Sequence, residues 1–221
     1  MKLLLTSNGL CNQSISKALF ELVGKPAPKI TIAFIPTAMN ITTGGKDWFV
    51  NDLYNIRKQG LKHMDIVDIS ALQKTMWLPR IEAADILFFS GGDSSHLMRW
   101  LKKSGLAKLL PELLKTRVYA GISAGSIVTA PTLWLSSRDR KNYYENVVDF
   151  KKESGLKFVD FYVRPHLNSP HFPRAQKRYL EEAAKSAPDV VYALDDNSAL
   201  KIEDNKIEII SEGEYLTLNQ K

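Results

Sequence analysis

The sequence predicts an α/β fold, a three-layer αβα sandwich around a mostly parallel sheet that is finished by an antiparallel edge. Between Lys2 and Ala120, short apolar runs alternate with amphipathic stretches of helical length. Strands separated by helices pair in parallel, and the helices then cover both faces of the sheet. Near the other end of the chain, two short apolar runs flank Asp204-Asn205, a dipeptide typical of a turn between antiparallel strands.

The expected strands are rich in Ile, Leu, Val and Phe. In chain order they are residues 2–6, 29–35, 62–68, 86–89, 118–120, 158–163, 190–194, 200–203 and 207–210. The expected helices carry apolar residues on one face. They are residues 14–23, 47–59, 95–102, 106–114 and 173–184. The segment 136–154 is rich in charged and aromatic residues and is expected to form a flap beside the site.

Composition indicates a single domain over residues 1–221, because 44% of the residues are hydrophobic and can bury one core. The formal charge is +6, but Lys and Arg are interspersed with Asp and Glu, which favours an acidic substrate over nucleic acid. No apolar run approaches the roughly 20 residues that a membrane span needs. The single cysteine, Cys11, allows no intrachain disulfide, which suits a reducing compartment. We therefore expect a cytoplasmic protein without nucleic-acid or membrane partners.

A Gly-x-Ser-x-Gly motif centred on Ser123 directly follows the expected strand 118–120. A strand that runs into such a turn and then into small residues is typical of a nucleophile elbow. The serine oxygen is then held at a helix N-terminus, where partial positive charge favours a developing oxyanion. The alternative is a glycine-rich turn whose serine only caps the helix. We favour Ser123 as the nucleophile.

A second glycine pair, Gly91-Gly92, follows the expected strand 86–89 and precedes another helix. Such a turn brings backbone N–H groups to the same edge of the sheet as Ser123. We expect an oxyanion hole formed by the N–H groups of Ala124 and Gly92, or Gly91 in place of Gly92. The simpler interpretation, a strand–helix turn closed by a polar cap, is compatible with this role.

A serine nucleophile needs a base, and the chain has four histidines. His63 precedes a short strand and His96 lies inside an expected helix, positions typical of structural residues. His166 follows the strand 158–163, and strand ends of such sheets present site residues. His166 is therefore the expected base, and His171 is the reserve.

An acid should orient the imidazole of the base. Asp139 lies between two arginines in the segment that follows Ser123, whereas Asp195 and Asp196 follow the strand 190–194. Asp139 is our first choice for the third member of the triad, and Asp196 is the second.

The succession of motifs resembles that of the peptidase E family, which groups aspartyl dipeptidases with cyanophycinases. The matching segments are Gly91-Gly92-x-Ser94, Gly121–Ser126, Pro165-His166, Arg174–Arg178 and residues 194–200, and the resemblance extends from Leu3 to about Ile202. The resemblance implies a class I glutamine amidotransferase-like fold in which serine replaces the usual cysteine of the elbow.

The family's functional residues fall on positions of this chain that match its motifs. The resemblance implies Ser123 as nucleophile, His166 as base, and Gly92 and Ala124 as oxyanion donors. It places the family's aspartate on or beside Asp139. It also implies that Arg174 binds the side chain of an N-terminal aspartate, which an arginine fork can bond bidentately. The chain departs from the family at Asp93, where an asparagine is usual, and in the short segment 167–173.

The sequence therefore predicts a serine peptidase that hydrolyses small peptides through an acyl-enzyme on Ser123, and the resemblance implies dipeptides with N-terminal Asp. We expect no metal and no other cofactor, because ligand spacings such as H-E-x-x-H or C-x-x-C do not occur. An α/β-hydrolase esterase would need a histidine later in the chain than His171. A catalytically silent amidotransferase-like domain that binds a small acidic ligand or a protein stays open, as does the choice between monomer and homodimer.

Overall fold

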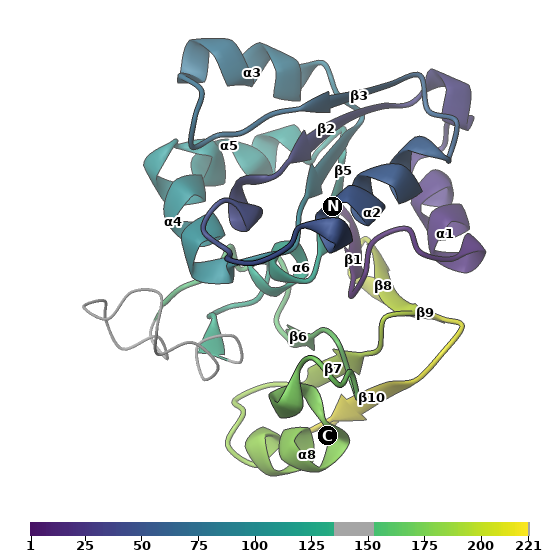
Figure 1. The fold of residues 1–221 in the computed structure, drawn as a ribbon, viewed down its shortest axis with the longest axis vertical. Helices are drawn as coiled ribbons and strands as arrows, with labels where there is room; N and C mark the ends of the chain where they lie inside the picture. The colour runs from purple at the N-terminus through teal and green to yellow at the C-terminus, as the bar shows by residue number, and fades with distance from the viewer. Residues whose placement is uncertain (135–152, 221) are drawn as a thin grey trace.

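The computed structural model, shown in Figure 1, describes residues 1–134 and 153–220. Its centre is a seven-stranded sheet of order β3-β2-β4-β5-β1-β8-β9. The strands are β1 (Lys2–Thr6), β2 (Thr31–Ile35), β3 (His63–Ile66), β4 (Ile86–Phe89), β5 (Val118–Ile122), β8 (Ser198–Glu203) and β9 (Lys206–Ser211). β1 to β5 are parallel, whereas β8 and β9 are antiparallel. The predicted fold class and antiparallel edge are confirmed.

Helices cover both faces of this sheet (Figure 1). One face carries α3 (Lys74–Glu82), α4 (Ser94–Lys103), α5 (Leu106–Leu113) and α6 (Ala124–Ile127), and the other carries α1 (Gln13–Val23) and α2 (Asp47–Arg57). The side chains of β1 alternate between the two cores. Leu3 and Leu5 pack with α3 to α6, whereas Leu4 packs with α1 and α2.

The central strands are apolar along their whole length because both of their faces are buried. All four residues of β4 are buried. Phe88 packs against Phe34 on one face, with ring centroids 5.9 Å apart. Phe89 stacks on Tyr119 on the other face, at 4.6 Å. These contacts fix the carboxyl ends of β4 and β5, where the two glycine motifs begin.

A second, three-stranded sheet lies beyond the carboxyl ends of the central strands (Figure 1). It has the order β10-β7-β6, with α8 (Lys177–Ala184) packed against it. Its strands are β6 (Tyr162–Arg164), β7 (Val191–Leu194) and β10 (Tyr215–Leu218), of which β6 and β7 are parallel. The sequence pattern predicts a single sheet and does not predict β10.

The chain passes from the small sheet to the large one between β7 and β8. Because β6 and β7 are parallel, with Arg164 opposite Ala193, the residues that follow the two strands lie side by side. Leu167 N donates to Leu194 O at 2.9 Å and continues this pairing. The topology therefore brings the segment around His166 next to the segment around Asp196.

Two helical segments differ from the sequence prediction. α3 was not predicted, because Pro79 lies within it and only Trp77 and Ile81 form a buried pair at helical spacing. The predicted helix 173–184 is divided into a short 3-10 turn, η4 (Pro173–Ala175), and α8, because Gln176 has an extended backbone. Two further 3-10 turns are η1 (Ala27–Lys29) and η2 (Thr37–Met39). Within the described residues, no helix has both the length and the apolar character needed to cross a bilayer.

Candidate active site

Ser123 lies between β5 and α6 with a backbone conformation that L-residues rarely adopt (φ 46°, ψ −102°). Such strain persists only where the surrounding structure enforces it. The neighbouring glycines leave no room for a side chain. A Cβ on Gly121 would lie 2.6 Å from the carbonyl carbon of Gly125, and a Cβ on Gly125 would lie 2.5 Å from Phe89 O. The Gly-x-Ser-x-Gly spacing is therefore required by the packing of β5 and α6 against β4.

Buried hydrogen bonds hold this strained turn. Ser123 N donates to Thr6 O at 3.0 Å, which ties the turn to the end of β1. The Ser126 hydroxyl lies 2.8 Å from Thr6 O and 2.9 Å from Gly121 O. Tyr119 donates its hydroxyl to Gly125 O at 2.6 Å. The orientation of Ser123 thus depends on β1 as well as on its own strand.

His166 lies between Ser123 and Asp196. Its Nε2 is 3.0 Å from Ser123 Oγ, and its Nδ1 is 2.6 Å from Asp196 Oδ1. A hydroxyl, an imidazole and a carboxylate in this order form the arrangement of a serine hydrolase triad. The structure therefore brings together the predicted nucleophile, the predicted base and the second choice for the acid. Asp139, the first choice, lies outside the described residues.

The carboxylate of Asp196 is suited to orient an imidazole. Burial by itself raises the pKa of Asp196, but the hydrogen bonds from His166 and Ser7 outweigh it and hold the pKa below its usual value. Cys11 Sγ donates to the backbone oxygen of Asp196 at 2.9 Å. Burial raises the pKa of the Cys11 thiol to about 11, so this thiol stays protonated at neutral pH.

Ser7 is a site residue that the sequence analysis did not assign. Its buried Oγ donates to Asp196 Oδ1 at 2.9 Å and accepts the backbone N–H of His166 at 2.9 Å. Ser7 follows β1, whose carboxyl end neighbours that of β5. The sequence does hold one indication of its role, the polar run 6–9 directly after a predicted strand. Site residues often follow the strands that end at one edge of such a sheet.

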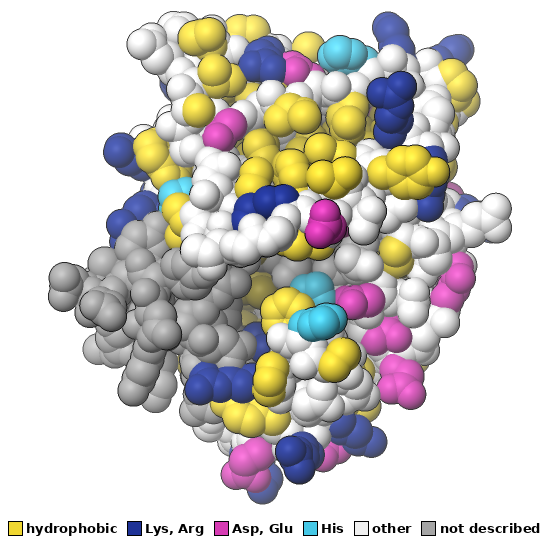
Figure 2. All heavy atoms as spheres, in the orientation of Figure 1, with side chains coloured by type: hydrophobic (Ala, Val, Ile, Leu, Met, Phe, Trp, Pro, Cys, Tyr) yellow, Lys and Arg dark blue, Asp and Glu magenta, His cyan; other side chains and the backbone are white. Residues whose placement is uncertain are grey.

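The segment after His166 returns over the imidazole. The ring of Phe172 stacks on that of His166, with centroids 4.2 Å apart and planes 7° apart. Arg174 lies two residues further, exposed, in η4. His171, the reserve base, is also exposed. Figure 2 shows histidine, acidic and apolar side chains gathered together on this face of the molecule.

The Gly91-Gly92 turn lies beside Ser123, as the sequence predicts. A Cβ placed on Gly91 would lie 3.6 Å from the Cβ of Ser123. Gly92 has φ 131°, and a Cβ there would lie 2.2 Å from Ala38 O. Asp93 caps α4 by accepting the N–H of His96 at 2.8 Å. The turn therefore caps a helix and also places backbone next to the serine.

Helix α2 approaches the loops that follow β4 and β1. Its Trp48 lies 3.6 Å from a Cβ placed on Gly91, and Asp52 Oδ1 lies 3.6 Å from a Cβ placed on Gly9. Asp52 is 4% exposed. Burial raises the pKa of its carboxyl to about 7.

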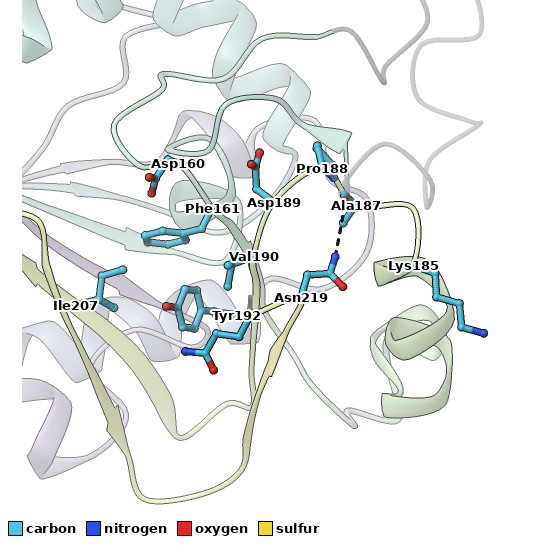
Figure 3. Close-up of a pocket in the computed structure, with 11 residues that line it drawn as sticks. Asp160, Phe161, Lys185, Ala187, Pro188, Asp189, Val190, Tyr192, Ile207 and Asn219 are labelled. Atoms are coloured by element: carbon cyan, nitrogen blue, oxygen red, sulfur yellow. Dashed lines mark hydrogen bonds between the residues drawn. The ribbon is translucent and has the colours of Figure 1, made fainter.

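A separate pocket of about 600 Å³ lies where β6 and β7 begin, at the ends of these strands away from His166 (Figure 3). It is lined by Phe161 and Tyr192, whose rings meet edge to face, and by the carboxylates of Asp160 and Asp189. Asn219 closes one side and donates to Ala187 O at 3.5 Å.

Residues 1–134 and 153–220 contain no cluster of three or more His, Cys, Asp or Glu residues that could hold a metal.

Comparison with known proteins identifies relatives of the whole chain. The model of peptidase family S51 matches residues 3–210. An uncharacterized peptidase of Pasteurella multocida is 26% identical over 182 residues, which are 81% of this chain and 84% of that protein. Peptidase E of Streptomyces coelicolor is 26% identical over 215 residues, which are 93% of this chain and 82% of that protein.

Solved structures share the fold. A Listeria monocytogenes protein assigned as a peptidase E superposes with a TM-score of 0.75 at 22% identity, over 96% of this chain and 98% of that one. A peptidase from an acI-B1 Actinobacterium superposes with a TM-score of 0.65 at 18% identity, over 98% of this chain and 93% of that one. The glutamine amidotransferase-like fold implied by the resemblance is thereby confirmed.

The glycine turn gives a first prediction, for which Gly92→Ala and Gly91→Ala form a matched pair. Gly92→Ala should lower the free energy of unfolding by more than about 2 kcal/mol, because its Cβ meets backbone at 2.2 Å and its φ is positive. Gly91→Ala should cost less than about 1 kcal/mol, because its Cβ meets only ordinary contacts from 3.6 Å. Urea unfolding of both variants measures this, and equal losses would contradict the geometry.

Asp52 gives a second prediction. The folded protein holds the Asp52 proton up to about pH 7, whereas an unfolded chain loses it near pH 3.9. The stability from this group is therefore complete below about pH 4 and lost as the pH rises through about 7. Asp52→Asn should raise the free energy of unfolding at pH 8 by roughly 4 kcal/mol and change it little at pH 4. Urea unfolding at both pH values tests this, with exposed Asp47→Asn on the same helix as the unchanged control.

Proposed function

This chain belongs to peptidase family S51, and from that premise we propose that it is a serine peptidase that hydrolyses short peptides through an acyl-enzyme on Ser123. One observation carries the proposal, the chain of contacts from Ser123 Oγ through His166 to Asp196 at 3.0 and 2.6 Å. Two relatives named as a peptidase and as peptidase E support it.

The proposed reaction begins when Ser123 Oγ attacks the scissile carbonyl carbon and His166 Nε2 takes the hydroxyl proton. Asp196 holds the imidazole and stabilises its positive charge. The N–H groups of Gly92 and Ala124 bind the oxyanion, and each is expected to contribute about 2.7–4 kcal/mol to the transition state. His166 then protonates the leaving amine, and a water activated by the same imidazole hydrolyses the acyl-enzyme.

We assign the third triad role to Asp196 rather than to Asp139. The support is direct contact, since Asp196 accepts from both His166 and Ser7 and its pKa is lowered. A lowered pKa keeps the acid ionised at neutral pH, as the role requires. The resemblance to the peptidase E family places the acid on or beside Asp139, and mutation of both Asp139 and Asp196 decides between them.

We further propose that Arg174 binds an acidic side chain at the N-terminus of the substrate. Arg174 is exposed and lies two residues after Phe172, which stacks on the base. A guanidinium can bond a carboxylate through two parallel hydrogen bonds. Arg178, an exposed arginine near the start of α8, provides a matched control.

A panel of dipeptides with different N-terminal residues tests this function. The wild type should cleave Asp-Xaa best, and Ser123→Ala should lose both hydrolysis and labelling by a fluorophosphonate probe. Arg174→Ala should lower kcat/KM for Asp-Xaa about 10-fold or more, with Arg178→Ala unchanged. A folded wild type that neither cleaves nor reacts with the probe would instead indicate a silent binding domain.

The two candidate acids predict different outcomes. Asp196→Asn should lower kcat by roughly 10³–10⁴-fold, because the imidazole loses the partner that fixes its tautomer. Asp139→Asn should leave kcat within about threefold, since on this proposal Asp139 has no part in the triad. Steady-state kinetics on one dipeptide compare the two. The reverse order of losses would return the role to Asp139.

Ser7→Ala should lower kcat by about 10- to 100-fold with a smaller change in KM, because a hydrogen bond to a charged group is lost. The Ser7 hydroxyl helps to lower the pKa of Asp196, so without it a proton should stay on the coupled Asp196–His166 pair to higher pH, and the acidic limb of the kcat profile should move to higher pH with it. Ser70→Ala, which removes another serine–aspartate hydrogen bond at Asp68, is the control. A loss of stability without a shifted profile would show that Ser7 is only structural.

A further inference from the structure

Phe172 is an exposed aromatic residue that the proposed mechanism does not use. Its ring lies face to face with the imidazole of His166, with centroids 4.2 Å apart and planes 7° apart. The side chain of His166 is 15% exposed, whereas Phe172 is 39% exposed. Phe172 is therefore the outer ring of the pair, and it covers one face of the base.

Backbone hydrogen bonds hold the turn that carries Phe172. Phe172 N donates to Ser169 O at 3.2 Å, and Phe172 O accepts the N–H of Ala175 at 2.8 Å. Ser169 N in turn donates to His166 O at 3.0 Å, and Asn168 N donates to Ala175 O at 3.0 Å. The segment from the base to η4 thus closes on itself, which fixes the position of Phe172 relative to His166.

Two further features stiffen this turn. Pro170 and Pro173 restrict the backbone before and after Phe172, because the proline ring fixes φ. The side chain of Gln176 donates from Nε2 to Ser169 O at 3.0 Å. Since the turn is ordered by these contacts, little additional conformational entropy is lost when the aromatic ring is held on the base.

The hydrogen-bonding contacts of the imidazole do not fix its orientation completely. Nδ1 of His166 contacts Asp196 Oδ1 at 2.6 Å, and Nε2 contacts Ser123 Oγ at 3.0 Å. These two contacts define a line through the ring nitrogens and do not by themselves prevent the ring plane from tilting about that line. A tilt weakens both contacts, because hydrogen bonds depend steeply on their angles. The parallel ring of Phe172 blocks the tilt on one side.

The backbone of His166 also indicates that the placement of this ring is enforced. His166 has φ 63°, in the left-handed region that residues with a side chain rarely adopt. Such a conformation persists only where the surrounding structure maintains it. The hydrogen bond from Ser169 N to His166 O belongs to the same turn as Phe172 and is one of the contacts that maintain it.

Proton transfer gives the stacked ring an electrostatic role as well. In the proposed reaction His166 takes the proton of Ser123 and becomes an imidazolium. A cation over the face of an aromatic ring, within about 6 Å of the centroid, is attracted by the negative charge of that face. The separation of 4.2 Å between the rings of Phe172 and His166 meets this condition. The attraction arises as the positive charge develops, so it favours the transition state over the ground state.

We propose that Phe172 is a positioning residue of this enzyme, whose ring keeps the imidazole of His166 directed at Ser123 and stabilises the imidazolium formed by proton transfer. The inference rests on the proposed peptidase function and adds to it a residue outside the triad. Phe172 acts through His166 and not on the substrate, so its removal should change kcat rather than KM.

The test compares side chains at position 172 with and without an aromatic ring. Phe172→Leu and Phe172→Met both remove the ring, so a folding defect in one of them does not decide the result, and Phe172→Tyr retains it. Without the ring, kcat for an Asp-Xaa dipeptide and the rate of Ser123 labelling by a fluorophosphonate probe should both fall about 5- to 30-fold. KM should stay within about twofold, and Phe172→Tyr should restore both rates to within about twofold. Tyr54→Leu, which removes an exposed ring from α2, is the control that should change neither rate.

Proton NMR of the imidazole reports the stack itself without any turnover. Protons above the face of an aromatic ring resonate upfield. The C–H signals of His166, identified by their loss in His166→Asn, should therefore lie upfield in the wild type and in Phe172→Tyr. They should move downfield in Phe172→Leu and Phe172→Met.

The outcomes separate this inference from the proposed function. Unchanged labelling and kcat in a folded variant without the ring overturn the role of Phe172, as does a raised KM at unchanged kcat. His166 signals that do not move when the ring is removed overturn the stack. A loss of stability in urea with unchanged rates shows that Phe172 only covers the surface. A folded wild type that the probe does not label refutes the peptidase function, and with it the role that rests on it.

Discussion

The hydrogen bonds of Ser7 are the constraint on which the candidate site depends. Ser123 follows a strand of the large sheet, whereas His166 follows a strand of the small sheet and Asp196 lies in the link between the two sheets. Ser7, at the end of β1, contacts both partners and also pairs with the start of β8 through Ser198 O. Misplacement of a catalytic group by about 1 Å can cost 100-fold in rate. The two sheets therefore need a fixed relation, and Ser7 supplies part of it.

Much of the large sheet could be predicted from the sequence because its strands are buried on both faces. β1 and β4 have the predicted bounds, since continuous apolar runs of this length have few other interpretations. The elbow was recognisable for a related reason. Gly121 and Gly125 touch backbone atoms, so the packing admits only glycine there, and Ser123 is identified by its neighbours. A position that sterically admits only glycine can therefore be recognised from the sequence pattern.

Other parts of the site depend on contacts between segments far apart in the chain, which leave weak local signals. Asp196 was the second choice for the acid. Its approach to His166 depends on the parallel pairing of β6 and β7, for which the local sequence holds no signal. Ser7 lies 159 residues from His166 in the chain, and its neighbours in the sequence identify it only as a polar residue in a loop. The burial of Asp52 was harder still to predict, since a charged residue in an amphipathic helix is expected to be exposed.

The pairing of β1 has a consequence for how the protein is made. β1 lies between β5 and β8, with Lys2 opposite Val118 on one side and Glu203 on the other. Because β8 follows β5 and the whole small sheet except β10 in the chain, it is synthesised long after β1. Contacts of such long sequence separation slow folding. Ser123 can meet His166 and Asp196 only after both later segments have been made, so a growing chain carries Ser123 before the two groups that complete its contacts.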